Sequence, residues 1–201
     1  MYSEIEKKKF ADECARFHTK DAPGLVIGVE MIDFALDIFG KPEDKILAVV
    51  ETAVCLPDVI QTMLGCTLGN RNIKVIPSLG RYAVTIYDRK NGRGVRVAID
   101  LSKIDKDETP EIFKFFHRTR DPEVETNMEK RKISGSIILS EFYKVGRKIL
   151  KTENVNVKIF GKPEIPRAAT CQVCFESFLQ KNADQEICLY CSKEEQYYTF
   201  A

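Results

Sequence analysis

Four of the seven cysteines in this 201-residue sequence crowd its last 31 residues and form two Cys-x-x-Cys pairs. Thirteen residues separate the pairs, which are Cys171 with Cys174 and Cys188 with Cys191. Each pair can turn two thiolates toward one ion, and four thiolates complete the tetrahedral shell that zinc prefers. Iron uses the same all-sulfur set, and spacing alone does not separate the two metals. We therefore expect a closed structural site, with zinc as the usual occupant and no coordination position open to a substrate.

The segment around these cysteines is small and acidic. Residues 171–201 carry two lysines against five carboxylates, a net charge of −3. Because cations that neutralise phosphates supply most non-specific affinity for nucleic acid, this charge argues against DNA or RNA as the partner. A segment of this size needs a staple to fold, and we expect it to contact a protein or to be purely structural. The aromatic residues available for such a contact, or for packing around the metal, are Phe175, Phe178, Tyr197, Tyr198 and Phe200.

A second group of polar and reactive side chains follows Cys55. If Pro57 starts a helix, Asp58 and Gln61 share one face of it. Either these two side chains contact a ligand, or Asp58 caps the helix and Gln61 faces solvent. The turn at residues 65–70 has two glycines and a threonine, enough for a backbone anion site, but it lacks the lysine of a P-loop.

A mixed α and β domain must position these side chains. We expect helices over residues 3–17 and 25–39. The second is apolar nearly all round, apart from an acidic stripe of Glu30, Asp33 and Asp37. Such a helix is either largely buried or placed at a subunit interface.

Strands and one further helix complete this domain. Apolar runs and β-branched content predict four strands, over residues 46–50, 82–87, 95–101 and 155–160. Asn91-Gly92 predicts a hairpin, because both residues tolerate positive φ. We also expect a helix over residues 133–151. Its basic strip is either a solvated face or a contact for an acidic partner and consists of Lys144, Arg147, Lys148 and Lys151.

A break in regular structure divides the chain. Residues 161–166 contain one glycine and two prolines. We place a linker at residues 161–169, between a core domain at 1–160 and a zinc module at 170–201. The predicted fold class is α+β, a mixed or antiparallel sheet with helices, plus the small carboxy-terminal zinc module.

Composition excludes several classes of protein. Thirty-one Lys and Arg against thirty Asp and Glu give a net charge of +1, so the global charge favours neither nucleic acid nor an anionic membrane. No stretch approaches the roughly 18 apolar residues of a membrane span, and the first ten residues lack a signal-peptide core. We expect a cytoplasmic protein, in which cysteines are metal ligands, catalytic groups or buried side chains more often than disulfides.

Several strings resemble the FmdE family, named for the protein encoded with formylmethanofuran dehydrogenase in methanogens. They are Cys55-Leu56-Pro57-Asp58-Val59-Ile60-Gln61, Gly65-Cys66-Thr67-Leu68-Gly69, Phe17-His18 followed by Pro23-Gly24-Leu25, and Gly92-x-Gly94-Val95-Arg96-Val97. Together with the four-cysteine segment they cover nearly the whole chain.

The resemblance implies an α+β core joined to a small treble-clef-like zinc finger, assembled as a homodimer. It also implies a second metal site, with His18 and Cys55 among its ligands. The family pattern His-Gly-His-x-Cys-Pro-Gly is altered here, because Lys20 replaces the second histidine and Ala22 replaces the cysteine. These changes remove two soft ligands and add a positive charge. Two alternatives remain: a residual metal site on His18 and Cys55 helped by Cys66, or a hydrogen-bonded histidine and buried thiols.

Three functions remain open, in order of preference. The first is a zinc-binding accessory or adaptor protein, with a possible ligand cleft in its core and a zinc module that contacts a protein partner. The second is a metal- or cysteine-dependent enzyme acting on a small molecule, with His18 and Cys55 as candidate catalytic residues. The third is a nucleic-acid-associated regulator. The candidate ligand-cleft residues are Asp58, Gln61, Cys66, Thr67 and Arg96.

Overall fold

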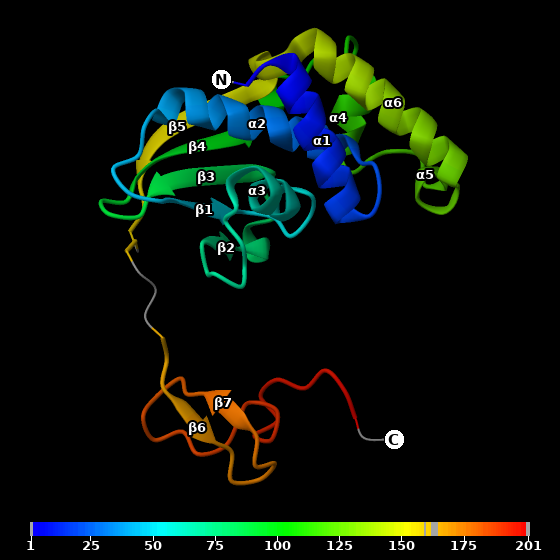
Figure 1. Ribbon diagram of the computed structural model, residues 1–201. Helices are drawn as coiled ribbons and strands as arrows, with labels where there is room; N and C mark the ends of the chain where they lie inside the picture. Colours follow the sequence, from blue (N-terminus) through cyan, green and yellow to red (C-terminus); the bar gives the residue numbers. More distant parts are fainter. Residues whose placement is uncertain (1, 159, 162–164, 200–201) are drawn as a thin grey trace. The chain divides into compact units, whose positions relative to one another are not determined.

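The computed structural model describes residues 2–158, 160–161 and 165–199. The chain divides into two compact units between Gly161 and Lys162. The larger unit has helices and a mixed sheet, which confirms the expected fold class (Figure 1). None of the helices in the described part of the chain is both long and apolar enough to cross a membrane. Phe200, considered above as a contact residue, lies outside the described residues.

The larger unit is built on a five-stranded sheet with the order β2-β1-β3-β4-β5. The strands are β1 (Ile46–Val50), β2 (Ile73–Val75), β3 (Ala83–Asp88), β4 (Arg93–Ile99) and β5 (Leu150–Asn156). Only β1 and β2 run parallel, and the other neighbours are antiparallel. The predicted hairpin at Asn91-Gly92 joins β3 to β4, and Gly92 adopts the positive φ of 73° that this turn requires.

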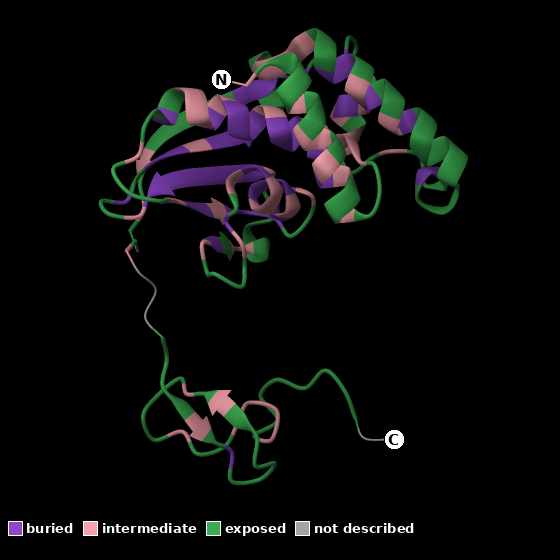
Figure 2. Cartoon of the chain, in the orientation of Figure 1, coloured by how far each residue is buried: buried purple, intermediate pink, exposed green. Residues whose placement is uncertain are grey.

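Helices cover one face of this sheet (Figure 1). They are α1 (Glu4–His18), α2 (Pro23–Phe39), α3 (Leu56–Leu64), α4 (Pro110–His117), α5 (Glu123–Thr126) and α6 (Met128–Val145). Three short 3-10 helices accompany them, η1 (Pro77–Leu79), η2 (Leu101–Lys103) and η3 (Gly146–Ile149). The buried residues concentrate on the inward sides of α2 and the central strands (Figure 2). This layer of apolar side chains is the core of the unit.

The amino-terminal expectations agree with the structure. Helices α1 and α2 lie where the sequence predicts them, at residues 3–17 and 25–39. Helix α1 starts with a capping box, in which the Ser3 hydroxyl accepts from the backbone of Glu6 and the Glu6 carboxylate accepts from the backbone of Ser3.

The predictions for residues 133–160 are partly wrong. Helix α6 begins earlier, at Met128, and ends at Val145. Residues 150–156 then form β5 and pair with β4 along seven positions. Gly146 has a φ of 54°, which ends the helical conformation, and the long ladder to β4 outweighs the helical pattern of the sequence. The predicted strand at 155–160 therefore overlaps β5 only at Val155 and Asn156, and Lys151 lies on a strand instead of a helical basic strip.

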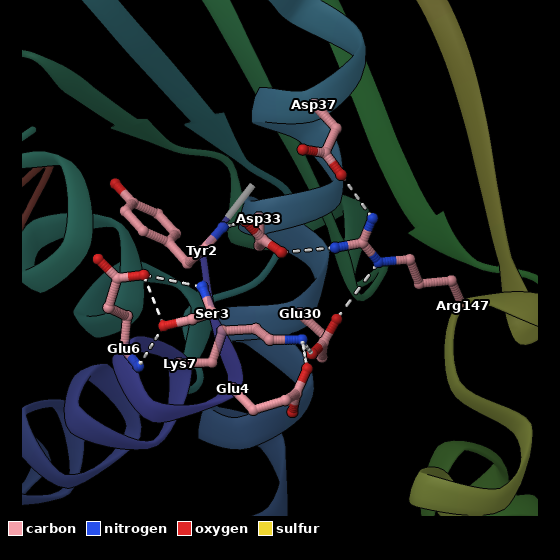
Figure 3. Close-up of polar contacts among 9 residues, drawn as sticks. All are labelled: Tyr2, Ser3, Glu4, Glu6, Lys7, Glu30, Asp33, Asp37 and Arg147. Carbon is pink, nitrogen blue, oxygen red and sulfur yellow. Dashed lines mark hydrogen bonds and ion pairs between the residues drawn. The ribbon is translucent and has the colours of Figure 1, made fainter.

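The acidic stripe of α2 is neutralised within the unit by two cations (Figure 3). Arg147, from η3, reaches Asp33 at 2.5 Å and Asp37 at 2.7 Å, and it lies 3.3 Å from Glu30. Lys7, from α1, pairs with Glu30. Asp33 is fully buried and also accepts a hydrogen bond from the backbone of Tyr2. Of the two expectations for this helix, burial is therefore the one confirmed.

The smaller unit contains a two-stranded antiparallel sheet, β6 (Ala168–Thr170) with β7 (Ser177–Leu179). Strand β6 begins inside the segment predicted as linker. Within the described residues of this unit Cys171 is the only fully buried apolar side chain, and many others are exposed. The unit lacks an apolar core of its own, so its fold depends on what the cysteines bind.

Replacing Arg147 by methionine should destabilise the larger unit by about 3 kcal/mol, because the buried carboxylate of Asp33 loses its cation. Lys148→Met is the matched control, since Lys148 is exposed and adjacent, and it should change stability by less than about 0.5 kcal/mol. Urea unfolding followed by far-UV circular dichroism measures both variants. Equal losses in the two variants would contradict a stabilising role for this network.

Candidate functional site

The four carboxy-terminal cysteines converge on one point. Their sulfur atoms all lie within 4.8 Å of one another, and the Cys174 and Cys188 sulfurs are 3.9 Å apart. Zinc–sulfur bonds of about 2.3 Å in a tetrahedron place sulfurs about 3.8 Å from each other. The cluster therefore matches the size of a zinc site, and the donor set also suits iron.

Backbone amides support this sulfur cluster. The amide of Cys188 donates to the Cys171 sulfur at 3.4 Å, and that of Cys191 donates to the Cys188 sulfur at 3.5 Å. Hydrogen bonds from the backbones of Cys174 and Cys188 lower the pKa of the Cys171 thiol to about 6. Burial and the neighbouring Cys188 sulfur raise the pKa of Cys191 to about 12. A divalent cation would supply the charge that four adjacent thiolates need.

Within the described residues, no other group of three or more His, Cys, Asp or Glu side chains is close enough to hold a metal ion. His18 is the last residue of α1, and its Nδ1 lies 2.6 Å from the Asp58 carboxylate on α3. This contact gives His18 the ordinary hydrogen-bonded role that was one of its two alternatives. A second metal site on His18 and Cys55 stays a prediction.

Cys55 occupies the N-cap of α3 in an uncommon conformation, with a φ of 53°. Pro57 lies in the first turn, so the helix expected there is confirmed. The Cys55 side chain lies beside Gly24, where an added Cβ would sit 2.9 Å from the sulfur and 2.8 Å from the Tyr82 hydroxyl. That hydroxyl donates a hydrogen bond to the Gly24 carbonyl at 2.5 Å. Only glycine allows α2 to approach both side chains so closely.

The Cys55 thiol is neutral at physiological pH. Burial, with a smaller contribution from the Asp58 carboxylate, raises its pKa to about 11, although Lys20 acts in the opposite direction. Because the thiolate is the nucleophile and the metal ligand, a neutral thiol is a poor candidate for either role.

The other predicted ligand residues around α3 do not converge on Cys55. Asp58 neither caps the helix nor lines a cavity, because it pairs with His18, and the Gln61 side chain accepts from the backbone of Leu68 at 3.3 Å. Cys66 is buried at the far end of α3 and donates to the Ile46 carbonyl at 3.3 Å. A nine-residue helix is about 13 Å long, so Cys55 and Cys66 cannot share one ion.

Thr67 belongs to the turn that follows α3. Its hydroxyl accepts a hydrogen bond from the backbone of Asn70 at 3.3 Å. The oxygen is thus used inside the turn, and Thr67 does not line the core cleft described next.

The core cleft is a cavity of about 590 Å³ in the larger unit. Cys55 and Arg96 are the two predicted site residues that line it. Arg96, on β4, makes paired hydrogen bonds to the Glu51 carboxylate at 2.8 and 2.9 Å and a third to Glu153 at 2.7 Å. The Arg96 guanidinium lowers the pKa of Glu51. These contacts fix the arginine against the sheet and use most of its donors.

Most of the cleft was not predicted from the sequence. Its other lining residues come from the segment before β3 and from the loop after α4, where an aromatic and basic string carries Phe115, Phe116, Arg118 and Arg120. That composition was a usable signal. It carried no information about its distance from Cys55, which is 60 residues away in the sequence.

Known proteins share much of this sequence and geometry. The sequence model described as FmdE, Molybdenum formylmethanofuran dehydrogenase operon, matches residues 17–157. A curated relative from Archaeoglobus fulgidus, described as a probable S-adenosyl-L-methionine-binding protein, is 30% identical over 191 residues, which cover 88% of this chain and 50% of the relative. The chain thus spans about half the length of that relative.

A solved structure is similar over nearly the whole chain. It is the crystal structure of a tungsten formylmethanofuran dehydrogenase FmdE-like protein from Syntrophus aciditrophicus. The TM-score is 0.75 and the sequences are 30% identical, over 96% of this chain and 95% of that one.

Alkylation measures the state of the Cys55 thiol. With a pKa of about 11, Cys55 should react with iodoacetamide at pH 7 about 100-fold more slowly than free cysteine, and faster as the pH rises toward 11. Peptide mapping by mass spectrometry gives the rate, and Cys55→Ser identifies the peptide. A rate at pH 7 equal to that of free cysteine would mean that Cys55 is an activated thiolate.

Proposed function

The chain belongs to the FmdE family, and from that premise we propose that it is a zinc-binding accessory protein without catalytic activity of its own. In this proposal the carboxy-terminal cysteines hold one structural zinc ion, and the core cleft holds a small molecule. The convergence of four sulfurs within 4.8 Å is the observation that carries the proposal. A shell of four protein ligands leaves no position on the metal for a substrate.

The enzyme alternative has less support. Its proposed nucleophile or metal ligand, Cys55, has a raised pKa, and His18 is held by Asp58 at 2.6 Å. Nucleophilic catalysis by a thiol needs a base within hydrogen-bond reach or a lowered pKa. No hydrogen bond joins Cys55 to a histidine among the described residues.

S-adenosylmethionine binding, the property printed for the Archaeoglobus fulgidus relative, is not carried over to this chain. The match covers half of that protein, so the named property can belong to the other half. The cleft here is lined by five cationic side chains against two acidic ones, a poor environment for a positively charged sulfonium group.

We propose that the smaller unit contacts a protein partner. Several apolar side chains are strongly exposed there, including Phe175 at 78% and Tyr197 at 90%. Exposed apolar groups on an acidic module favour an apolar partner surface with a basic rim over nucleic acid. Because the cysteines must stay reduced to bind metal, we place the protein in the cytoplasm.

Metal content tests the zinc proposal. The purified protein should contain one zinc per chain by elemental mass spectrometry, and Cys174→Ser should lose it because the four-sulfur shell is broken. Cys55→Ser is the matched control and should retain the zinc. Iron in place of zinc would contradict the assignment of the metal. Two metal ions per chain, one of them lost in Cys55→Ser, would contradict the non-catalytic core.

We also propose that the protein is a homodimer, as the family resemblance implies. Sedimentation equilibrium of the zinc-loaded protein should give twice the 22.9 kDa mass of one chain. A mass of one chain at micromolar concentration would contradict this proposal.

A further inference from the structure

The charges around the core cleft are unbalanced. Its lining includes five cationic side chains and two carboxylates, Asp121 and Glu125. The Asp121 carboxylate is already used, because it accepts a hydrogen bond from the backbone of Glu123 at 2.8 Å at the start of α5. The cleft therefore presents a net positive field to its contents.

Two of the five cations are neutralised by the protein. Arg96 is paired with Glu51 and Glu153, and Arg81 lies 2.6 Å from the same Glu51 carboxylate. The other three, Arg118, Arg120 and Lys151, form no ion pair with any residue in the described ranges. They come from the loop after α4 and from β5, so chain segments distant in sequence bring them to one cavity.

Aromatic rings form another part of the wall. Phe116 contacts Tyr82 edge to face, with ring centroids 5.5 Å apart, and contacts Phe115 in the same way at 5.0 Å. The guanidinium of Arg120 lies 5.0 Å from the centre of the Phe115 ring. Flat apolar surface thus adjoins the three cations that lack carboxylate partners.

The floor of the cleft adds no opposing charge. Burial raises the pKa of Tyr82 well above its ordinary value, and burial raises that of Cys55 to about 11. Both groups are neutral at physiological pH, so they leave the field of the three cations in place.

We propose that the core cleft binds a phosphorylated small molecule that carries a planar ring. The phosphate is held by Arg118 and Lys151, and the ring lies against Phe115, Phe116 and Tyr82. A guanidinium donates two parallel hydrogen bonds to a phosphate, and an ammonium adds a point charge. The volume of about 590 Å³ lies within the range of small-molecule sites, roughly 300 to 1,000 Å³. This inference rests on the ligand cleft of the proposed function and specifies its ligand.

Calorimetric titration of the full-length, zinc-loaded protein tests the inference with three probes. AMP carries both the ring and the phosphate, adenosine lacks the phosphate, and ribose 5-phosphate lacks the ring. AMP should bind with a Kd about tenfold lower than either of the others, because it alone makes both sets of contacts. Raising the salt from about 50 to about 300 mM should weaken AMP binding, since the cations are partly exposed.

The outcomes separate this inference from the proposed function. Adenosine that binds as tightly as AMP would overturn the phosphate contact while leaving a ligand cleft. Ribose 5-phosphate that binds as tightly as AMP would overturn the ring contact. Failure of all three probes to bind at millimolar concentration would overturn both this inference and the ligand cleft, with the zinc content unaffected.

Two variants locate the phosphate. Arg118→Asn removes the charge and suits the left-handed conformation at this position, where φ is 55°. Lys151→Gln removes the second charge on an independent element. Each should raise the Kd for AMP about tenfold. Lys9→Gln on the exposed side of α1 is the matched control and should leave the Kd unchanged. Unchanged AMP binding in both cleft variants would overturn the assignment of the phosphate contact.

Discussion

The core of this protein depends on the neutralisation of helix α2. The helix is apolar nearly all round and packs between the sheet and three other helices, yet it carries Glu30, Asp33 and Asp37. Asp33 is fully buried, and an unpaired carboxylate in that position would cost several kcal/mol. Arg147 supplies the compensating cation at the point where α6 ends and β5 begins. The ion pairs therefore fix the path of the chain into the last strand of the sheet.

The same requirement recurs on the sheet. Glu51 follows β1 and is 5% exposed, and its charge is met by Arg96 from β4 and by Arg81. These pairs hold one wall of the cleft in place. Arg118 and Lys151 have no such carboxylate partner among the described residues, although they line the same cavity. A protein that matches its buried carboxylates with arginines but leaves cations in a cleft has the charge pattern of an anion site.

Local patterns predicted much of the fold and the whole metal cluster. The paired cysteines need only the turn of each Cys-x-x-Cys pair to converge, and the cap at Ser3 and the turn at Gly92 are equally local. The strand at residues 150–156 was missed, because its partner β4 lies over 50 residues earlier and pairing with it outweighs a helical pattern. The cleft was missed for the same reason, since it combines side chains from β4, β5 and the loop after α4. His18 and Asp58 were considered separately, and only the fold shows that they are partners.

The protein joins a closed metal site, which stabilises one unit, to an open cationic cleft in the other. The closed site follows from the donor set, whereas the cleft carries the claim about what the protein recognises. A crystal structure of the protein grown with AMP tests that claim most directly. We expect the phosphate within hydrogen-bond distance of Arg118 or Lys151 and the adenine ring against Phe116. A nucleotide found only outside the cleft, or with its phosphate turned away from both cations, would contradict the account.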